Sequence, residues 1–298
     1  MRKIAFLIGA WTLSLAAVLG NTPAHAQAAL TWVSGVGDDA NPCSRTAPCL
    51  TFAGTITKTA AGGEINCLAP GDFNSGDGGT LAITKSITID CTSVPGYFRM
   101  TSAVPGITIT GSGIVVYLRN LVIDGAGVGT DGISISNATN VQLQNVTIQS
   151  FAGRGLYNAS SSADGVALFN SYVVQNGGSG VVTAGASGSA ILLRNTICAF
   201  NEYGAAVAGS NSMTFQNSRA DANTGAGVYG SPGSFVYIVG AGITANNICV
   251  ESLGTTTIDN SDIVGNSTGI NGASSSFGNN RIFSNTSAGT APTPIALK

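Results

Sequence analysis

The sequence contains little charge and almost no histidine. Lysine, arginine, aspartate and glutamate together make up 9% of the 298 residues, and the formal net charge is −2. A chain with so little positive charge lacks the basic field that attracts nucleic acid, so we expect no nucleic-acid partner. The only histidine is His25, in a segment that we expect to be removed on maturation. A mature chain without histidine excludes histidine general bases and Ser-His-Asp triads.

Metal-binding patterns are also missing. The sequence has no Cys-x-x-Cys pair, and after loss of His25 it has no imidazole ligand either. Structural zinc sites are built from cysteine and histidine side chains at short spacings. We therefore expect no metal ion and no cofactor.

Long apolar runs are confined to the N-terminus. Arg2 and Lys3 precede an apolar run from Ile4 to Leu19, and Ala24-His25-Ala26 follows as a cleavage site. This order is typical of a secretory signal over residues 1–26. An uncleaved membrane anchor is the alternative, but the run is short for a bilayer. We expect a secreted or periplasmic protein with no membrane span after signal removal.

What the sequence does contain is a repeat. Its anchor is an asparagine, with an apolar residue two places before it and an apolar or small residue three places after it. Most of the later repeats carry a second asparagine six places after the anchor, as in Asn195 and Asn201. A recurring unit of this length indicates a structural repeat. The anchors are Asn120, Asn145, Asn170, Asn195, Asn217, Gly240 as a substitute, Asn260 and Asn279.

The repeat predicts an all-β, right-handed parallel β-helix of about nine coils. Apolar residues alternate around each anchor, which is the period of a strand, and each unit is too short for a strand, a full helix and loops. Coils stacked at ~4.8 Å would place aligned residues on one another and let aligned asparagines form a ladder. The leucine-rich repeat is the competing interpretation, but it needs several leucines and a helical or extended return segment in each unit.

Three segments are predicted along the chain. Residues 1–26 are the signal peptide, residues 27–61 an N-terminal cap, and residues 62–298 the β-helix. Within the cap, the spacing of Phe52, Ile56 and Ala60 indicates a short helix that would close the open end of the solenoid. An uncapped solenoid would expose a strand edge.

The six cysteines suggest disulfides in an exported protein. Cys43 and Cys49 bracket a short loop, and Cys67 and Cys91 are separated by about one coil, so we expect these two bridges. Cys198 takes an inward position after Asn195, where it would behave as a small apolar residue. Cys249 follows Ile248, which we align with inward Val181, Val228 and Ile270. We therefore expect Cys249 to point outward and both of these thiols to remain free.

A resemblance to a known family supports the fold. The run Trp32-Val-Ser-Gly-Val-Gly-Asp-Asp-Ala-Asn-Pro-Cys43, followed by Ala47-Pro-Cys-Leu-Thr-Phe52 and Gly62-Gly-Glu-Ile-Asn-Cys-Leu-Ala-Pro-Gly71, resembles the N-terminal segment of secreted pectate-lyase-like β-helix proteins. The resemblance implies the fold and an extracytoplasmic location. It implies no particular activity, because one fold carries many functions.

Two enzymatic routes of that superfamily can be compared with the sequence. Gly129-Thr130-Asp131-Gly132 resembles the Asn-Thr-Asp-Gly motif of polygalacturonase-like enzymes, but the leading Asn, the following Asp-Asp pair and the His-Gly and Arg-x-Lys motifs are missing. Pectate-lyase-like enzymes hold Ca²⁺ with clustered aspartates and use Arg or Lys as a base. The candidates here are Asp124, Asp131 and Asp164 with Arg154. No two are at equivalent repeat positions, so we interpret the aspartates as solvated turn residues.

The resemblance also implies that the first strand of each coil lines the substrate groove. The outward residues of these strands carry no charge in our alignment, and Tyr157 and Tyr229 could stack on neutral sugar rings. The sequence thus favours a non-catalytic exported protein that binds polysaccharide or a cell-surface glycan, with no catalytic, cofactor or metal residue assigned. A diverged polysaccharide lyase or glycoside hydrolase is the alternative. The outward residues are predicted as Ser134, Tyr157, Val182, Ala206, Tyr229, Cys249 and Asn271.

Overall fold

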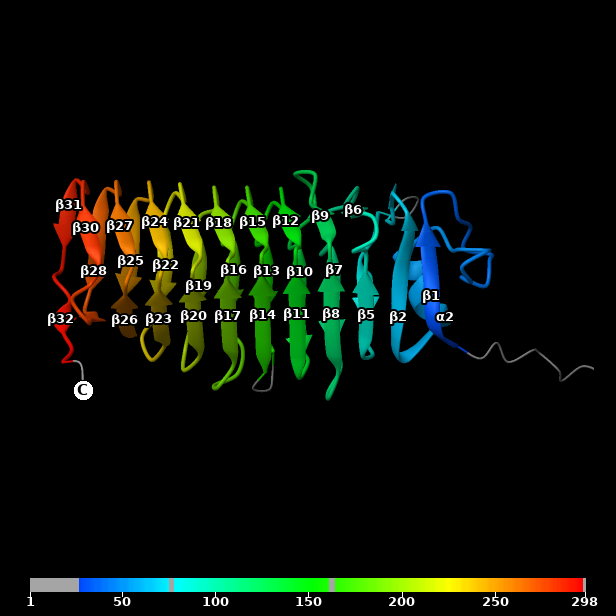
Figure 1. Cartoon of the computed structure of the whole chain (residues 1–298), viewed down its shortest axis with the longest axis horizontal. Helices are drawn as coiled ribbons and strands as arrows, with labels where there is room; N and C mark the ends of the chain where they lie inside the picture. The colour runs from blue at the N-terminus through cyan, green and yellow to red at the C-terminus, as the bar shows by residue number, and fades with distance from the viewer. Residues whose placement is uncertain (1–26, 75–77, 161–163, 297–298) are drawn as a thin grey trace, which may run out of the picture.

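The computed structural model describes residues 27–74, 78–160 and 164–296 of the chain. The predicted signal segment, 1–26, lies outside the described residues. The described chain forms a rod of stacked coils, with the N-terminal elements at one end and the C-terminal strands at the other (Figure 1). Its strands build three parallel sheets of 12, 10 and 10 strands. The predicted solenoid of about nine coils is confirmed.

Each complete coil contributes one strand to each sheet, here called sheets I, II and III in the order of their strands within a coil such as β4, β5 and β6. Sheet I contains β4 (Leu81–Ile83), β7 (Ile107–Thr110), β10 (Ile133–Asn137), β13 (Leu156–Asn158), β16 (Val181–Thr183), β19 (Ala205–Val207), β22 (Ala226–Gly230), β25 (Ile248–Ser252), β28 (Thr268–Gly272) and β31 (Ser287–Gly289). Sheet II contains β1 (Ala28–Ser34), β2 (Thr59–Ala69), β5 (Ile87–Asp90), β8 (Val115–Arg119), β11 (Asn140–Gln144), β14 (Gly165–Phe169), β17 (Ala190–Arg194), β20 (Ser212–Gln216), β23 (Phe235–Val239), β26 (Thr255–Asp259), β29 (Ser275–Ser276) and β32 (Thr293–Pro294). Sheet III contains β3 (Gly71–Asp72), β6 (Gly96–Arg99), β9 (Leu121–Asp124), β12 (Thr147–Gln149), β15 (Tyr172–Val174), β18 (Ile197–Ala199), β21 (Arg219–Asp221), β24 (Gly242–Thr244), β27 (Asp262–Val264) and β30 (Arg281–Phe283).

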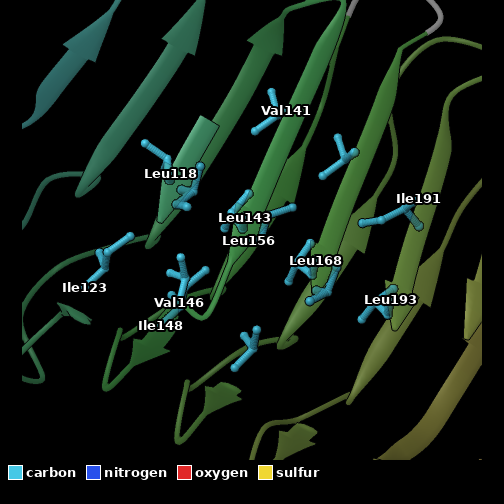
Figure 2. Packing of buried hydrophobic residues seen from close by; sticks show 14 of the residues in the cluster. Leu118, Ile123, Val141, Leu143, Val146, Ile148, Leu156, Leu168, Ile191 and Leu193 are labelled. Carbon is cyan, nitrogen blue, oxygen red and sulfur yellow. The ribbon is translucent and has the colours of Figure 1, made fainter. Parts of the chain in front are cut away.

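The core consists of columns of apolar side chains that run along the rod. Leu143 pairs in register with Leu118 on one side and Leu168 on the other, and Leu168 pairs with Leu193. All four side chains are fully buried, and Figure 2 shows them in a row across consecutive strands. The alternation of buried and outward residues in these strands follows from the strand period of two.

The anchor asparagines occupy the tight turn between sheets II and III. Asn145 and Asn195 have φ values of 55° and 52°, the left-handed region that asparagine tolerates better than most residues. The Asn145 amide donates to Asn120 Oδ1 at 2.5 Å, and the Asn195 amide donates to Asn170 Oδ1 at 3.1 Å. These side chains lie at the surface, so the anchor column mainly provides a turn conformation.

The second set of asparagines lies between sheets III and I, and all of its members are buried except Asn285, which is half-buried. The backbone N–H of Asn201 donates to Asn223 Oδ1 at 3.0 Å, and the N–H of Asn223 donates to Asn246 Oδ1 at 2.9 Å. The Asn223 amide also donates to Asn246 Oδ1 at 2.9 Å and to the Cys198 carbonyl at 3.2 Å. Each side chain thus provides the turn backbone with hydrogen bonds that it would otherwise lack. The set comprises Asn176, Asn201, Asn223, Asn246, Asn266 and Asn285.

Helix α2 (Phe52–Lys58) lies at the N-terminal end of the rod. Thr51 caps its first turn, and the Lys85 ammonium donates to the Ile56 carbonyl at its last turn, at 2.8 Å. Phe52 packs against Phe73, with ring centroids 5.0 Å apart. A helix was predicted here, but it ends before Ala60, which belongs to β2. No helix in the described part of the chain has the length and apolar character needed to cross a bilayer.

Both predicted disulfides, Cys43–Cys49 and Cys67–Cys91, are present. The predicted free thiols are confirmed as well, but the expected outward position of Cys249 is wrong, because both free cysteines are fully buried. Val250, not Ile248, pairs with Val228. Cys249 therefore stands at the place that Gly227 holds in the preceding coil. This place faces inward, because a Cβ atom built on Gly227 would lie 2.5 Å from Ile243 Cγ2.

We expect the two free thiols to be inert in the folded protein. Burial, helped by the negative charge of Asp221, raises the pKa of Cys198 to about 12, and burial raises that of Cys249 well above its ordinary value. Because the pKa of each thiol is higher in the folded than in the unfolded protein, folding favours the neutral thiol. The resulting contribution to stability is complete below the unfolded pKa of ~8.5 and is lost as the pH rises above that value. A thiol-reactive disulfide reagent should label neither cysteine in native protein and both after unfolding. Rapid labelling of either thiol in native protein would contradict the burial.

Candidate functional site

Sheet I presents the outward row that was predicted to line a groove, with one correction. Ser134 pairs with Tyr157, Tyr157 with Val182, and Val182 with Ala206. The row then continues through Tyr229 and Glu251 to Asn271. Glu251, not Cys249, occupies the predicted sixth place, so the expectation of an uncharged row is wrong. The cause is the same misalignment that placed Cys249 outside: Ile248 was aligned with Val228, which pairs with Val250.

A hollow of about 280 Å³ lies on the outer face of sheet I. Val182 and Ala206 of the outward row line it, and their short side chains leave space between the larger side chains beside them. Tyr203 and Tyr229 also line it, with ring centroids 5.5 Å apart and planes tilted by 53°. Tyr229 comes from β22, and Tyr203 from the turn that leads into β19. Sequence reasoning missed Tyr203 because it considered only strand positions.

Two carboxylates accompany this tyrosine pair. Glu251 lies next to Tyr229 in the strand register, and Glu202 precedes Tyr203 in the chain. Burial raises the pKa of the Tyr203 hydroxyl, and the charges of Glu202 and Glu251 and the Tyr229 hydroxyl add to the increase. Both glutamates are therefore close enough to act on the same phenol. The whole sequence contains only three glutamates, and two of them gather here.

The nearest cation among the aligned turn residues that include Tyr203 is Arg154, and its charge is already neutralised. Arg154 donates to both carboxylate oxygens of Asp131, at 3.0 Å and 2.8 Å, and its guanidinium lies 3.4 Å from the centre of the Tyr157 ring. Burial alone would lower the pKa of Arg154, but the hydrogen bonds and charge of Asp131 raise it. Asp131 is thus fixed in a bidentate ion pair and is not a solvated turn residue. A carboxylate held in this way is poorly placed to act as a general acid.

The other two candidate aspartates lie elsewhere on the coil. Asp124 ends β9 on sheet III and accepts from the Ala126 N–H at 2.8 Å. Asp164 precedes β14 on sheet II and is only 7% exposed, so it is not a solvated turn residue either. The Asn158 amide donates to it at 3.0 Å. No cluster of three metal-ligating side chains occurs among the described residues.

Two of the other hollows in the described chain, both of similar size, are less suited to a ligand. One of about 230 Å³ lies on sheet II beside Phe235 and Tyr237, where serine and threonine make up half of the lining residues. The other, of about 330 Å³, lies at the N-terminal cap near Lys58. The Lys58 ammonium is already bound to backbone carbonyls, including that of Asn41 at 2.5 Å. The hollow on sheet I is therefore the candidate site.

Comparison with known proteins agrees with this architecture. Residues 131–287, more than half of the chain, match the family described as "Right handed beta helix region". A comparison with curated proteins found no match. Among solved structures, pectate lyase Pel9A has a TM-score of 0.53 at 18% identity, over 85% of this chain and 72% of the lyase. The A-module of mannuronan C-5 epimerase AlgE6 from Azotobacter vinelandii has a TM-score of 0.37 at 13% identity, over 90% and 89% of the two chains.

The likeness to the lyase, at this identity, is a likeness of fold. The family match rests on the same stacked coils that the repeat predicted and that the strand register shows. This protein is therefore a member of the right-handed parallel β-helix family and has a pectate-lyase-like fold.

Proposed function

We propose that this protein is exported and binds a polysaccharide, without cleaving it, through the hollow on sheet I. The observation that carries the proposal is the pair of tilted rings, Tyr203 and Tyr229, at the edge of a hollow with a floor of small side chains. Aromatic side chains with a polar tip provide a large apolar contact and a hydrogen-bonding hydroxyl together. A sugar ring offers the matching surfaces, an apolar face and a rim of hydroxyls.

The arrangement of the acidic residues supports binding rather than cleavage. Inverting glycosidases hold two carboxyl groups ~6.5–9.5 Å apart on either side of the scissile bond. Here Asp131 is bound by Arg154, while Asp124 and Asp164 lie on other sheets. Glu202 and Glu251 flank the tyrosine pair from one turn and one strand, a placement that suits hydrogen bonds to sugar hydroxyls. The two disulfides favour an oxidising, extracytoplasmic compartment.

The proposal predicts binding without product release. Purified protein should bind at least one of chitin, chitosan, cellulose, xylan, polygalacturonate and alginate, and Tyr229→Ala should weaken this binding about tenfold, equivalent to ~1.4 kcal/mol. Depletion from solution by the insoluble or immobilised polysaccharide gives the affinity. Reducing ends and unsaturated products, followed with and without calcium, should not increase.

A second tyrosine provides the control. Tyr172 is 48% exposed but lies on sheet III, away from the hollow, so Tyr172→Ala should leave binding unchanged. Equal loss in both variants would indicate a non-specific aromatic effect. Product release that disappears in Glu251→Gln or Asp131→Asn would replace the proposal with the alternative, a diverged lyase or hydrolase.

A further inference from the structure

We propose that the hollow recognises a polysaccharide whose sugars carry protonated amino groups. This inference rests on the proposed glycan-binding function and adds the chemistry of the ligand. Its basis is a hollow edged by two tyrosine rings, with Glu251 beside Tyr229 in the strand register and Glu202 directly before Tyr203 in the chain. Aromatic faces and carboxylates both attract ammonium groups, the first through the ring quadrupole and the second through charge and hydrogen bonds.

Among the described residues of the outward row and of the turn column that contains Tyr203, no unpaired cation accompanies the two glutamates, so the local charge is negative. Arg154 is in the same turn column as Tyr203 but two coils away, about 10 Å at the coil spacing of ~4.8 Å. Its charge is matched by Asp131 in a bidentate pair and covered on one side by the Tyr157 ring. In the outward row of sheet I, whose described residues run from Ser134 to Asn271, Glu251 is the only charged residue.

The two rings are placed to contact a cation. They are tilted by 53° with centroids 5.5 Å apart, so a group in the hollow can approach both faces or edges. Val182 and Ala206 leave the floor open along the rod, so a polymer can continue past the tyrosines over the neighbouring coils. A polyuronate would bring its carboxylates near Glu202 and Glu251, and like charges repel one another. An amino-sugar polymer fits the charge of this surface.

The test compares three hexasaccharides by titration calorimetry at mildly acidic pH and low salt. They are β-1,4-linked glucosamine, its fully N-acetylated counterpart, and galacturonate. We expect glucosamine to bind on the order of tenfold more tightly than the acetylated sugar, and galacturonate to bind weakest. Added salt should reduce the preference, since screening weakens exposed charge pairs. Equal affinity for the charged and acetylated sugars would overturn the inference while leaving glycan binding intact.

Charge-removing variants locate the effect. Glu251→Gln and Glu202→Gln should each lower affinity for the glucosamine hexamer several-fold and leave affinity for the acetylated hexamer unchanged. Glu64→Gln, on sheet II, is the matched control and should change neither. A preference for glucosamine that survives in both groove variants would overturn the assignment to this hollow.

A lysine-rich peptide of similar charge separates a sugar site from a general cation site. If the inference is right, the peptide should compete poorly with the glucosamine hexamer, because it lacks sugar rings to stack on the tyrosines. Full competition by the peptide would overturn the inference that the ligand of the hollow is a glycan. Absence of binding by every hexamer and every polysaccharide would refute the proposed function itself, a result distinct from loss of the charge preference.

Discussion

Leu193→Ala is expected to lower the free energy of unfolding by ~2–5 kcal/mol. Leu193 is fully buried in β17 and pairs in register with Leu168 on one side and Phe215 on the other. Truncation removes buried apolar surface and leaves a cavity that neighbouring coils cannot close without moving their strands. In a stacked repeat each coil is stabilised by its contacts with both neighbours, so one truncation weakens two interfaces.

The neighbouring residue in the same strand is the control. Leu192 lies next to Leu193 but points outward and is only partly buried, between Ala167 and Thr214 in the register. Leu192→Ala should cost no more than about 1 kcal/mol, because it leaves no internal cavity. Thermal and denaturant melts of both variants measure the difference. Equal losses would mean that the strand does not bury alternate residues as described.

Most of the fold could be predicted because the repeat fixes which residues face inward. From Asn120 onward the anchor position, the apolar residue before it and the apolar or small residue after it recur in every coil, with Gly240 replacing the asparagine once. Aligned residues in stacked coils must share an environment. Column membership therefore predicts burial, as it does for Leu143 and Leu193. The Cys67–Cys91 disulfide followed from the same logic, since these two cysteines are about one coil apart.

The candidate site was harder to predict because it depends on turn lengths. Between the buried asparagine and the first inward residue of sheet I, one coil has four intervening residues, Asn223 to Val228, and the next has three, Asn246 to Val250. Because the turns differ in length, Ile248 was aligned with Val228, although Val250, two residues later, holds that place in the register. The sequence does contain a signal that fixes the register: Gly180, Gly204, Gly227 and Gly269 each precede the first inward residue. Cys249 takes that place in its coil, which leaves Glu251 on the surface.

The energetic importance of the two asparagine columns also could not be read from the repeat alone. The pattern singles out the anchors, such as Asn195, because they recur most regularly. The structure places the anchors at the surface and buries the second set. A surface asparagine contributes by adopting the left-handed backbone conformation of the turn. A buried asparagine instead forms hydrogen bonds with backbone groups that water cannot reach.

Asn223→Ala is therefore expected to destabilise the protein more than a change at an anchor. Asn223 is 2% exposed, accepts from the Asn201 N–H and donates to the Cys198 carbonyl and to Asn246 Oδ1. Removing its amide leaves buried groups on three neighbours without this partner, and each unsatisfied group costs ~1–3 kcal/mol. The unfolding midpoint should fall accordingly, by an amount similar to that of Leu193→Ala.

The matched control is Asn217→Gly, at the anchor of the same coil. Asn217 is exposed with φ of 48°, and the next coil already uses Gly240 at this place with φ of 62°. Glycine adopts this conformation without strain, so the folded turn is kept and only the unfolded chain gains entropy. Asn217→Gly should lower stability by less than about 1 kcal/mol. If Asn217→Gly proved as damaging as Asn223→Ala, stability would depend on the surface column, and the buried asparagines would contribute little beyond filling their turns.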